Sequence, residues 1–151
     1  MVFRGHCQGK RVAIKQRFWP QNDSKQQQLC ITEFKNEVKI LAMVSHPNIV
    51  RFLGSVQQKP HFCSLSEYCE GNVGTFLDMC KSQIVDATWE LLFNIALGAA
   101  RAIQYLHARE PQILHKDIKA ENLLLTSDFT VKVRMYEHES AVIARGSRPR
   151  T

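Results

Sequence analysis

The segment from His115 to Asn122 carries the side chains of this sequence that are best suited to chemistry. It places a carboxylate, an ammonium group and a carboxamide close together, on Asp117, Lys119 and Asn122. Phosphoryl transfer uses groups of these types: a carboxylate that accepts or orients a hydroxyl, a cation beside the moving phosphoryl group, and an oxygen ligand for Mg²⁺. The alternative is a charged surface turn, so the interpretation depends on the elements around this segment.

The first half of the chain is expected to be rich in strands. Residues 2–16 alternate apolar and polar side chains around a glycine-containing turn, which predicts a hairpin. Residues 20–28 are polar without an apolar period and are expected to form a mobile loop. Apolar residues then recur at steps of three and four over residues 31–44, which predicts an amphipathic helix. Two more strands are expected, at residues 49–56 and 61–68.

The second half is expected to be mainly helical. Residues 70–72, Glu-Gly-Asn, read as a flexible joint between the two halves. The pattern over residues 89–107 predicts a long helix, with either Asp86 or Thr88 as its N-cap. The apolar residues expected on the inner face of this helix are Leu92, Ile95, Ala96, Ala99, Ile103 and Leu106.

The charged segment is expected to be held by a pair of strands that follows it. Residues 123–125 and 130–133 are apolar or alternating and are separated by a polar turn. A short loop that runs directly into a strand can hold its polar side chains in a fixed arrangement. Together with the strand-rich first half, this indicates an α+β fold.

Glu37 stands out within the predicted helix at residues 31–44. It lies three residues after Phe34 and four before Leu41, so it shares the apolar face. A buried carboxylate costs free energy unless a cation meets it. The alternative is a position at the edge of the face, from which the carboxylate reaches solvent.

Several of these segments resemble motifs of eukaryotic protein kinases, and they occur in the family's order. Residues 115–122, His-Lys-Asp-Ile-Lys-Ala-Glu-Asn, are similar to the catalytic loop H-R-D-L-x-x-x-N. Residues 12–15, Val-Ala-Ile-Lys, resemble the V-A-I-K strand. Residues 34–38 and 52–54, Phe-Lys-Asn-Glu-Val and Phe-Leu-Gly, most resemble the tyrosine-kinase-like group, whose members mostly phosphorylate Ser and Thr.

The resemblance implies ATP-dependent phosphoryl transfer to Ser or Thr of proteins. In the roles it implies, Asp117 is the base, Lys119 is the cation that stabilises the phosphoryl group, and Asn122 is a ligand of Mg²⁺. Lys15 would bind the α- and β-phosphates of ATP and pair with Glu37. The implied cofactors are therefore ATP and Mg²⁺.

The same resemblance implies a site for the adenine ring. Ser66 would be a small gatekeeper residue, and the backbone of Glu67 and Cys69 would form hydrogen bonds with the base. Ala13 and Leu124 would lie on its two faces. Each of these residues is also compatible with ordinary packing.

Two parts of the family pattern are missing, so the implied two-lobe kinase fold is expected to be incomplete and truncated at both ends. No G-x-G-x-x-G motif is found, and residues 135–137, Met-Tyr-Glu, stand where Asp-Phe-Gly is expected. A thioether cannot replace a carboxylate as a hard ligand for Mg²⁺. A partial kinase domain is expected at residues 1–133, with the small lobe at 1–68 and the start of the large lobe at 69–133, followed by a disordered basic tail at 134–151.

Composition narrows the remaining possibilities. The chain has 151 residues and a net charge of +6. Because its basic residues are scattered, neither nucleic acid nor a membrane is an expected partner. A nucleic-acid binder would rest on net charge alone. Five cysteines without C-x-x-C spacing favour reduced thiols in a cytoplasmic protein. The expected partners are ATP and a protein substrate or a partner kinase. The alternative function is a catalytically inactive, pseudokinase-like module that binds nucleotide or a partner.

Overall fold

The computed structural model describes residues 1–21, 23–135 and 142–143. The chain forms two compact units, of which the first contains Met1–Ser45 and Val50–Cys69. The second contains His46–Ile49 and the chain from Glu70 onward. The chain therefore passes from one unit to the other more than once, and each unit is described separately below.

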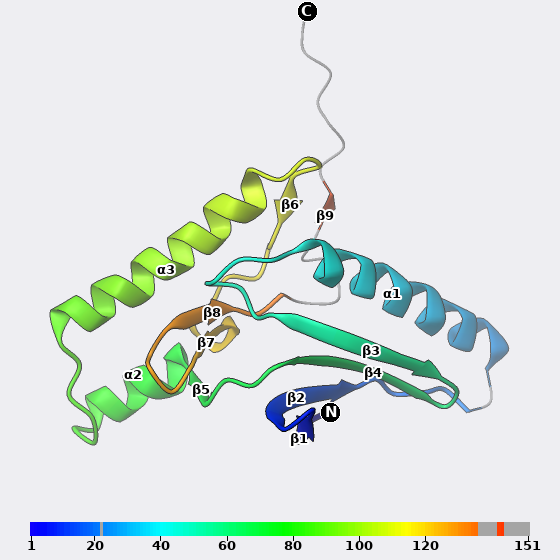
Figure 1. Cartoon of the computed structure of the whole chain (residues 1–151), viewed down its shortest axis with the longest axis horizontal. Coiled ribbons are helices and arrows are strands. Elements are labelled where there is room, and N and C mark those ends of the chain that lie inside the picture. The colour runs from blue at the N-terminus through cyan, green and yellow to red at the C-terminus, as the bar shows by residue number, and fades with distance from the viewer. Residues whose placement is uncertain (22, 136–141, 144–151) are drawn as a thin grey trace, which may run out of the picture. The chain divides into compact units, whose positions relative to one another are not determined.

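A four-stranded antiparallel sheet forms the first unit together with one helix (Figure 1). The first two strands are joined at Gln8 and Gly9, whose φ values of 50° and 76° are typical of a type I′ turn. The hairpin predicted at residues 2–16 is confirmed. In the order in which they lie in the sheet, the strands are β1 (Val2–Cys7), β2 (Lys10–Gln16), β4 (His61–Glu67) and β3 (Phe52–Gln58).

Helix α1 (Ser24–Met43) begins earlier than the apolar period predicts. The side chain of Asp23 accepts hydrogen bonds from the backbone N–H groups of Lys25 and Gln26, at 2.9 and 3.0 Å. An aspartate at this position satisfies donors that the first turn otherwise leaves unpaired. The mobile loop expected at residues 20–28 is therefore wrong from Ser24 onward, because an N-cap starts the helix before its apolar face begins.

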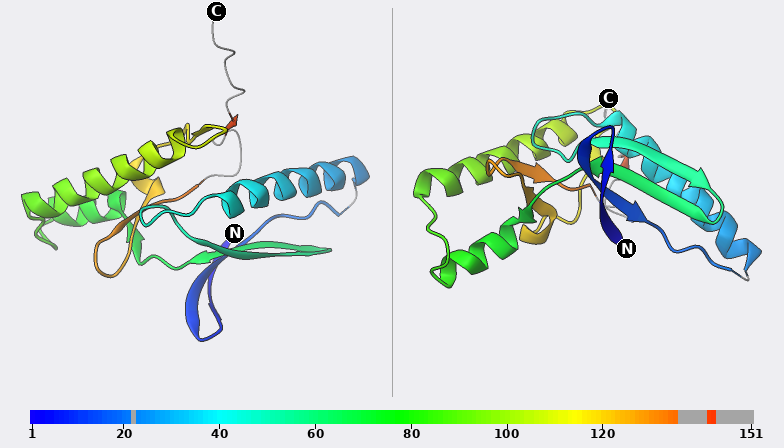
Figure 2. Two further views of the ribbon diagram at one scale, coloured as in Figure 1. Left: turned by 45° about the horizontal axis from the view of Figure 1, so that its top comes forward. Right: turned by 60° about the horizontal axis from the view of Figure 1, so that its bottom comes forward.

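Aromatic side chains form the contact between α1 and the sheet of the first unit. Phe34 on α1 meets Phe62 of β4 edge to face, with ring centroids 5.4 Å apart. Phe62 in turn stacks on Trp19 at 4.9 Å. In both views of Figure 2, α1 runs alongside the β3–β4 pair. This packing buries the side of α1 that carries Glu37.

The described residues of the second unit include two α-helices, α2 (Val73–Lys81) and α3 (Trp89–His107). The helix predicted at residues 89–107 is confirmed, and its cap is Thr88, whose hydroxyl oxygen accepts a hydrogen bond from the backbone N–H of Leu91 at 3.2 Å. The predicted strand pair is also confirmed, as part of a three-stranded antiparallel sheet. Its strands, in order, are β5 (Gly71–Asn72), β7 (Leu123–Leu125) and β8 (Val131–Val133).

Two expectations about irregular segments are corrected. The joint expected at residues 70–72 is ordered, because Gly71–Asn72 pairs with β7 and the side chain of Asn72 caps α2. Within the tail expected at residues 134–151, Val142–Ile143 forms strand β9, which pairs with β6 (Ile113–Leu114). Residues 136–141 and 144–151 of that tail lie outside the described residues.

The buried face of α3 is rotated from the predicted one. Ala96 is exposed, whereas Gly98 and Ala102 are buried together with Ile95, Ala99 and Leu106. The reason is a close approach between α3 and β8, at which a Cβ atom on Gly98 would lie 2.5 Å from Val131 Cγ1. In the part of the chain that the structure describes, none of the helices has the length and apolar character needed to span a membrane.

The segment His46–Ile49 is tied to β8 through Asn48. The side-chain amide of Asn48 donates to the carbonyl of Val131 at 3.0 Å, and the N–H of Val133 donates to the carbonyl of Asn48 at 2.7 Å. The backbone N–H of Asn48 donates to Nδ1 of His46 at 3.0 Å. This last bond requires the unprotonated form of Nδ1.

The stability of the second unit is expected to depend on the protonation of His46. Burial, followed by the charges of Arg101 and Lys132, lowers the pKa of His46 below its ordinary value. The unfolded chain therefore takes up a proton at a higher pH than the folded one, and stability is lost as the pH falls below about 6.5. Urea midpoints at about pH 7.5 and about pH 5.5 should differ less in His46→Asn than in the unsubstituted protein; equal differences would contradict this.

Candidate active site

His115 anchors the loop that follows β6. The backbone N–H of Asp117 donates to Nδ1 of His115 at 3.3 Å, so Nε2 carries the ring proton and donates to the carbonyl of Arg134 at 2.9 Å. Lys116, between His115 and Asp117, has a φ of 58°, which turns the chain sharply at this point. The buried imidazole thus connects the start of the loop to the end of β8.

The loop and the one-turn helix η1 (Ala120–Asn122) bring three polar side chains together. The Nδ2 group of Asn122 donates to Oδ2 of Asp117 at 2.8 Å and to its backbone carbonyl at 2.7 Å. Nζ of Lys119 lies 3.2 Å from the same Oδ2 atom. Asn122 is fully buried, whereas 36% of the Asp117 side chain and 51% of the Lys119 side chain are exposed. A rigid interior group therefore orients a carboxylate that solvent and ligands can reach.

The environment of Asp117 favours its ionised form. The hydrogen bond from Lys119 is the largest cause that lowers the pKa of this carboxyl group, and the bond from Asn122 adds to it, while burial acts in the opposite direction. Asp117 is therefore a carboxylate at neutral pH. A carboxylate with a lowered pKa is a weak base, so it is better suited to orienting a hydroxyl group than to removing its proton early in a reaction.

Arg134 contacts this group and is a residue that the motif comparison does not include. Its Nη2 group donates to Oδ1 of Asn122 at 2.8 Å and to the carbonyl of Glu121 at 3.4 Å. The side chain of Asn122 is therefore bound at both ends, by Arg134 at its oxygen and by Asp117 at its nitrogen. The signal in the sequence is only positional, since Arg134 directly follows the strand that ends at Val133.

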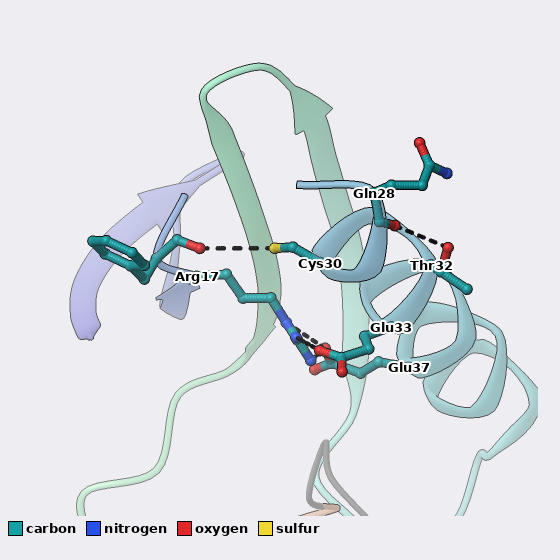
Figure 3. Close-up of polar contacts among 7 residues, drawn as sticks. Arg17, Gln28, Cys30, Thr32, Glu33 and Glu37 are labelled. Carbon is teal, nitrogen blue, oxygen red and sulfur yellow. Dashed lines mark hydrogen bonds and ion pairs between the residues drawn. The ribbon is translucent and has the colours of Figure 1, made fainter. Parts of the chain in front are cut away.

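Glu37, in the first unit, is buried as predicted and contacts Arg17 (Figure 3). Nη2 and Nε of Arg17 lie 2.7 and 3.2 Å from Oε2 of Glu37, and Nη1 lies 3.5 Å from Oε2 of Glu33. Arg17 comes two residues after Lys15, and its backbone N–H donates to the carbonyl of Phe62, which extends the strand pairing of β2 by one residue. Its side chain is therefore expected on the same side of the sheet as that of Lys15. Arg17 was not predicted from the sequence, in which its spacing from Lys15 indicates the side of the strand but not the partner of its side chain.

The residues expected to contact adenine fall into two sets. In the first unit, Ala13 of β2 lies opposite Ser66 of β4, and Cys69 is the last residue of that unit. The side chain of Glu67 accepts a hydrogen bond from the backbone N–H of Arg51 at 2.7 Å, which fixes the end of β4. In the second unit, Leu124 lies at the centre of β7, opposite Lys132 of β8.

Comparison with known proteins decides the family. A family model described as the protein kinase domain matches residues 1–142. The chain belongs to the protein kinase domain family. It is 35% identical over 132 residues to a protein described as probable serine/threonine-protein kinase drkD of Dictyostelium discoideum, covering 87% of this chain and 10% of that protein. It is 32% identical over 133 residues to the serine/threonine/tyrosine-protein kinase HT1 of Arabidopsis thaliana, covering 87% of this chain and 33% of that kinase.

The kinase domain family and the kinase-type α+β fold expected from the sequence are thus confirmed. The chain spans a third or less of the length of these two relatives. The segment with Asp117, Lys119 and Asn122 resembles the catalytic loop of this family, H-R-D-L-x-x-x-N, and is called the catalytic loop below.

The residues of this kinase domain do not fit the Mg²⁺ ion that protein kinases generally use with ATP. The expected ligand atom, Oδ1 of Asn122, already accepts a charge-assisted hydrogen bond from Arg134. At the position of the family's metal-binding Asp stands Met135, which is buried and offers only a thioether. Among the described residues, no three His, Cys, Asp or Glu side chains are grouped as a metal site.

Proposed function

We propose that this kinase domain transfers a phosphoryl group from ATP to Ser or Thr of a protein substrate, as a member of the tyrosine-kinase-like group. The observation that supports this best is the catalytic loop, in which Asn122 and Lys119 hold an ionised, partly exposed Asp117. Both side-chain contacts that the structure gives for Asp117 use Oδ2. Its Oδ1 atom would accept the hydrogen bond of the acceptor hydroxyl group.

Lys119 and Asp117 would act on different parts of the reaction. Asp117 would align the hydroxyl group with the phosphoryl group and take up its proton late, in keeping with its lowered pKa. Lys119 has an exposed ammonium group, which can meet the charge on the transferring phosphoryl oxygens. Because the residues present do not fit Mg²⁺, the proposal assigns no step to a metal, and Asn122 acts by orienting Asp117.

The proposal also includes the residues that the family resemblance assigns to ATP. We propose a small lobe at residues 1–68 and the start of a large lobe at residues 69–133. Lys15 would bind the phosphates of ATP, with Glu37 held in place by Arg17. The adenine contacts would come from Ala13, Ser66, Glu67, Cys69 and Leu124, in a cytoplasmic protein that binds neither nucleic acid nor a membrane.

The proposal predicts that Asp117→Asn lowers phosphotransfer by about a hundredfold or more, because the amide cannot accept the hydroxyl proton. The measurement is transfer of radiolabelled phosphate from ATP to a generic Ser/Thr protein substrate. Asp86→Asn is a matched control, since Asp86 is an exposed acid outside the catalytic loop. Turnover that survives in Asp117→Asn, or that is absent from the unsubstituted protein, would refute the proposal.

A second function is favoured by one observation at the same site. Arg134 is bound to Asn122, and Met135 takes the position of the metal-binding Asp. This combination suits a pseudokinase-like module that binds nucleotide or a partner kinase without catalysis. Thermal-shift measurements with ATP separate the two functions: stabilisation by ATP without turnover supports this module, and turnover that depends on Asp117 excludes it.

A further inference from the structure

The side chain of Asn122 connects a cation to the carboxylate of the catalytic loop. Its oxygen accepts from the guanidinium group of Arg134 at 2.8 Å, and its nitrogen donates to Oδ2 of Asp117 at 2.8 Å. Each bond includes a charged group, so each is stronger than a bond between neutral groups, and the two polarise the amide in the same direction. The arrangement also fixes which end of the amide faces Asp117.

The backbone of Arg134 is tied to both ends of the same loop. Its N–H donates to the carbonyl of Asn122 at 2.9 Å, and its carbonyl accepts from Nε2 of His115 at 2.9 Å. Asn122 and His115 are both buried. The guanidinium group therefore approaches Asn122 from a backbone that the loop itself holds in position.

A divalent cation at Oδ1 of Asn122 would compete with this contact. It would have to replace the charge-assisted bond and lie beside a guanidinium group of the same sign. Lys119, also positive, lies 3.2 Å from Oδ2 of Asp117, the oxygen to which Asn122 donates. The negative charge of Asp117 is thus balanced by two side chains of this chain, Lys119 directly and Arg134 through Asn122.

We propose that Arg134 is the resident cation of the catalytic loop, which takes the position of a metal ion on Asn122 and orients Asp117 through it. Arg134 is a positioning residue in this role, since its contact with Asp117 runs through the amide of Asn122. The order of the loop is then independent of divalent cations.

The contact is tested by a double-mutant cycle with Arg134→Met and Asn122→Ala, measured by urea unfolding. The two substitutions should be coupled by about tenfold in the folding equilibrium constant, as expected for a hydrogen bond to a charged group. The same cycle with Lys132→Met, on β8 two residues before Arg134, should show coupling below about twofold. If Arg134→Met does not fold, Arg134→Lys replaces it. The expected coupling is then about threefold, because an ammonium group lacks the planar fork of donors of a guanidinium group. Coupling below about twofold at Arg134 would overturn the proposal.

The second test uses Mn²⁺ alone as a paramagnetic probe, with nuclear magnetic resonance detection of the Asn122 side-chain amide. In the unsubstituted protein this signal should persist at a Mn²⁺ concentration that broadens it in Arg134→Met. Broadening at the same concentration in both proteins would overturn the proposal. Neither test includes nucleotide or turnover, so its outcome is independent of the phosphotransfer assay.

Discussion

Replacing Arg17 by methionine is expected to lower the free energy of unfolding by about 3 kcal/mol. The carboxylate of Glu37 is almost fully buried, with 4% of its side chain exposed, and Arg17 lies 2.7 Å away with 10% exposed. Methionine keeps an apolar stem but removes the charge, the hydrogen bonds and the guanidinium group, whose Cζ lies 5.8 Å from the centre of the Phe34 ring. A buried carboxylate then loses the cation that compensates its desolvation.

Urea unfolding measures this loss, and two further variants identify its cause. Lys35→Met removes a positive charge from the exposed side of α1 and should change the free energy of unfolding by less than about 0.5 kcal/mol. Adding Glu37→Leu to Arg17→Met should recover most of the loss, since it removes the buried carboxylate that has lost its contacts with Arg17. A loss below about 1 kcal/mol in the single variant would show that Arg17 is not the main compensating cation.

Replacing Gly98 by alanine is expected to destabilise the second unit by about 2 kcal/mol. In an exposed helix interior the same change stabilises by about 0.5–1 kcal/mol, because glycine loses more backbone freedom on folding. Here the new Cβ atom would lie 2.5 Å from Val131 Cγ1 and 2.8 Å from Nδ2 of Asn48. The helix would have to move away from β8 and strain the bond from Asn48 to the carbonyl of Val131.

The direction of the change makes this test decisive. Urea unfolding of Gly98→Ala should show lower stability, while Asn94→Ala, at an exposed position of the same helix, should be neutral or slightly stabilising. A gain in stability in Gly98→Ala would contradict the close approach of α3 and β8 at Gly98.

The sequence predicted those parts of the fold that depend on local patterns. The limits of α3, the hairpin of β1 and β2, and the pairing of β7 with β8 follow from periodicity and turn residues. The start of α1 was missed, because residues 24–28 have good helix propensity and a capping aspartate but no apolar period. The rotated face of α3 could not be foreseen, since the burial of Gly98 depends on a strand far away in the sequence.

The candidate site shows the same division. Motif spacing identified Asp117, Lys119 and Asn122, which come from one short segment and lie together. It did not indicate Arg17 or Arg134, because a long flexible side chain can point in many directions and spacing along the chain does not choose among them. The partner of a buried polar group is decided by tertiary packing.

The crossing of the chain between units at His46–Ile49 constrains how this protein can be dissected. A fragment starting at Glu70 would lack Asn48, which supplies the acceptor for the N–H of Val133 and the donor for the carbonyl of Val131. These two backbone groups of β8, which lies at the edge of the three-stranded sheet, would then lose their partners. A separately expressed second unit must therefore be supplied with residues 46–49, either as a peptide or by a circular permutation of the chain. An expression boundary drawn after Cys69 would separate these residues from the rest of their unit.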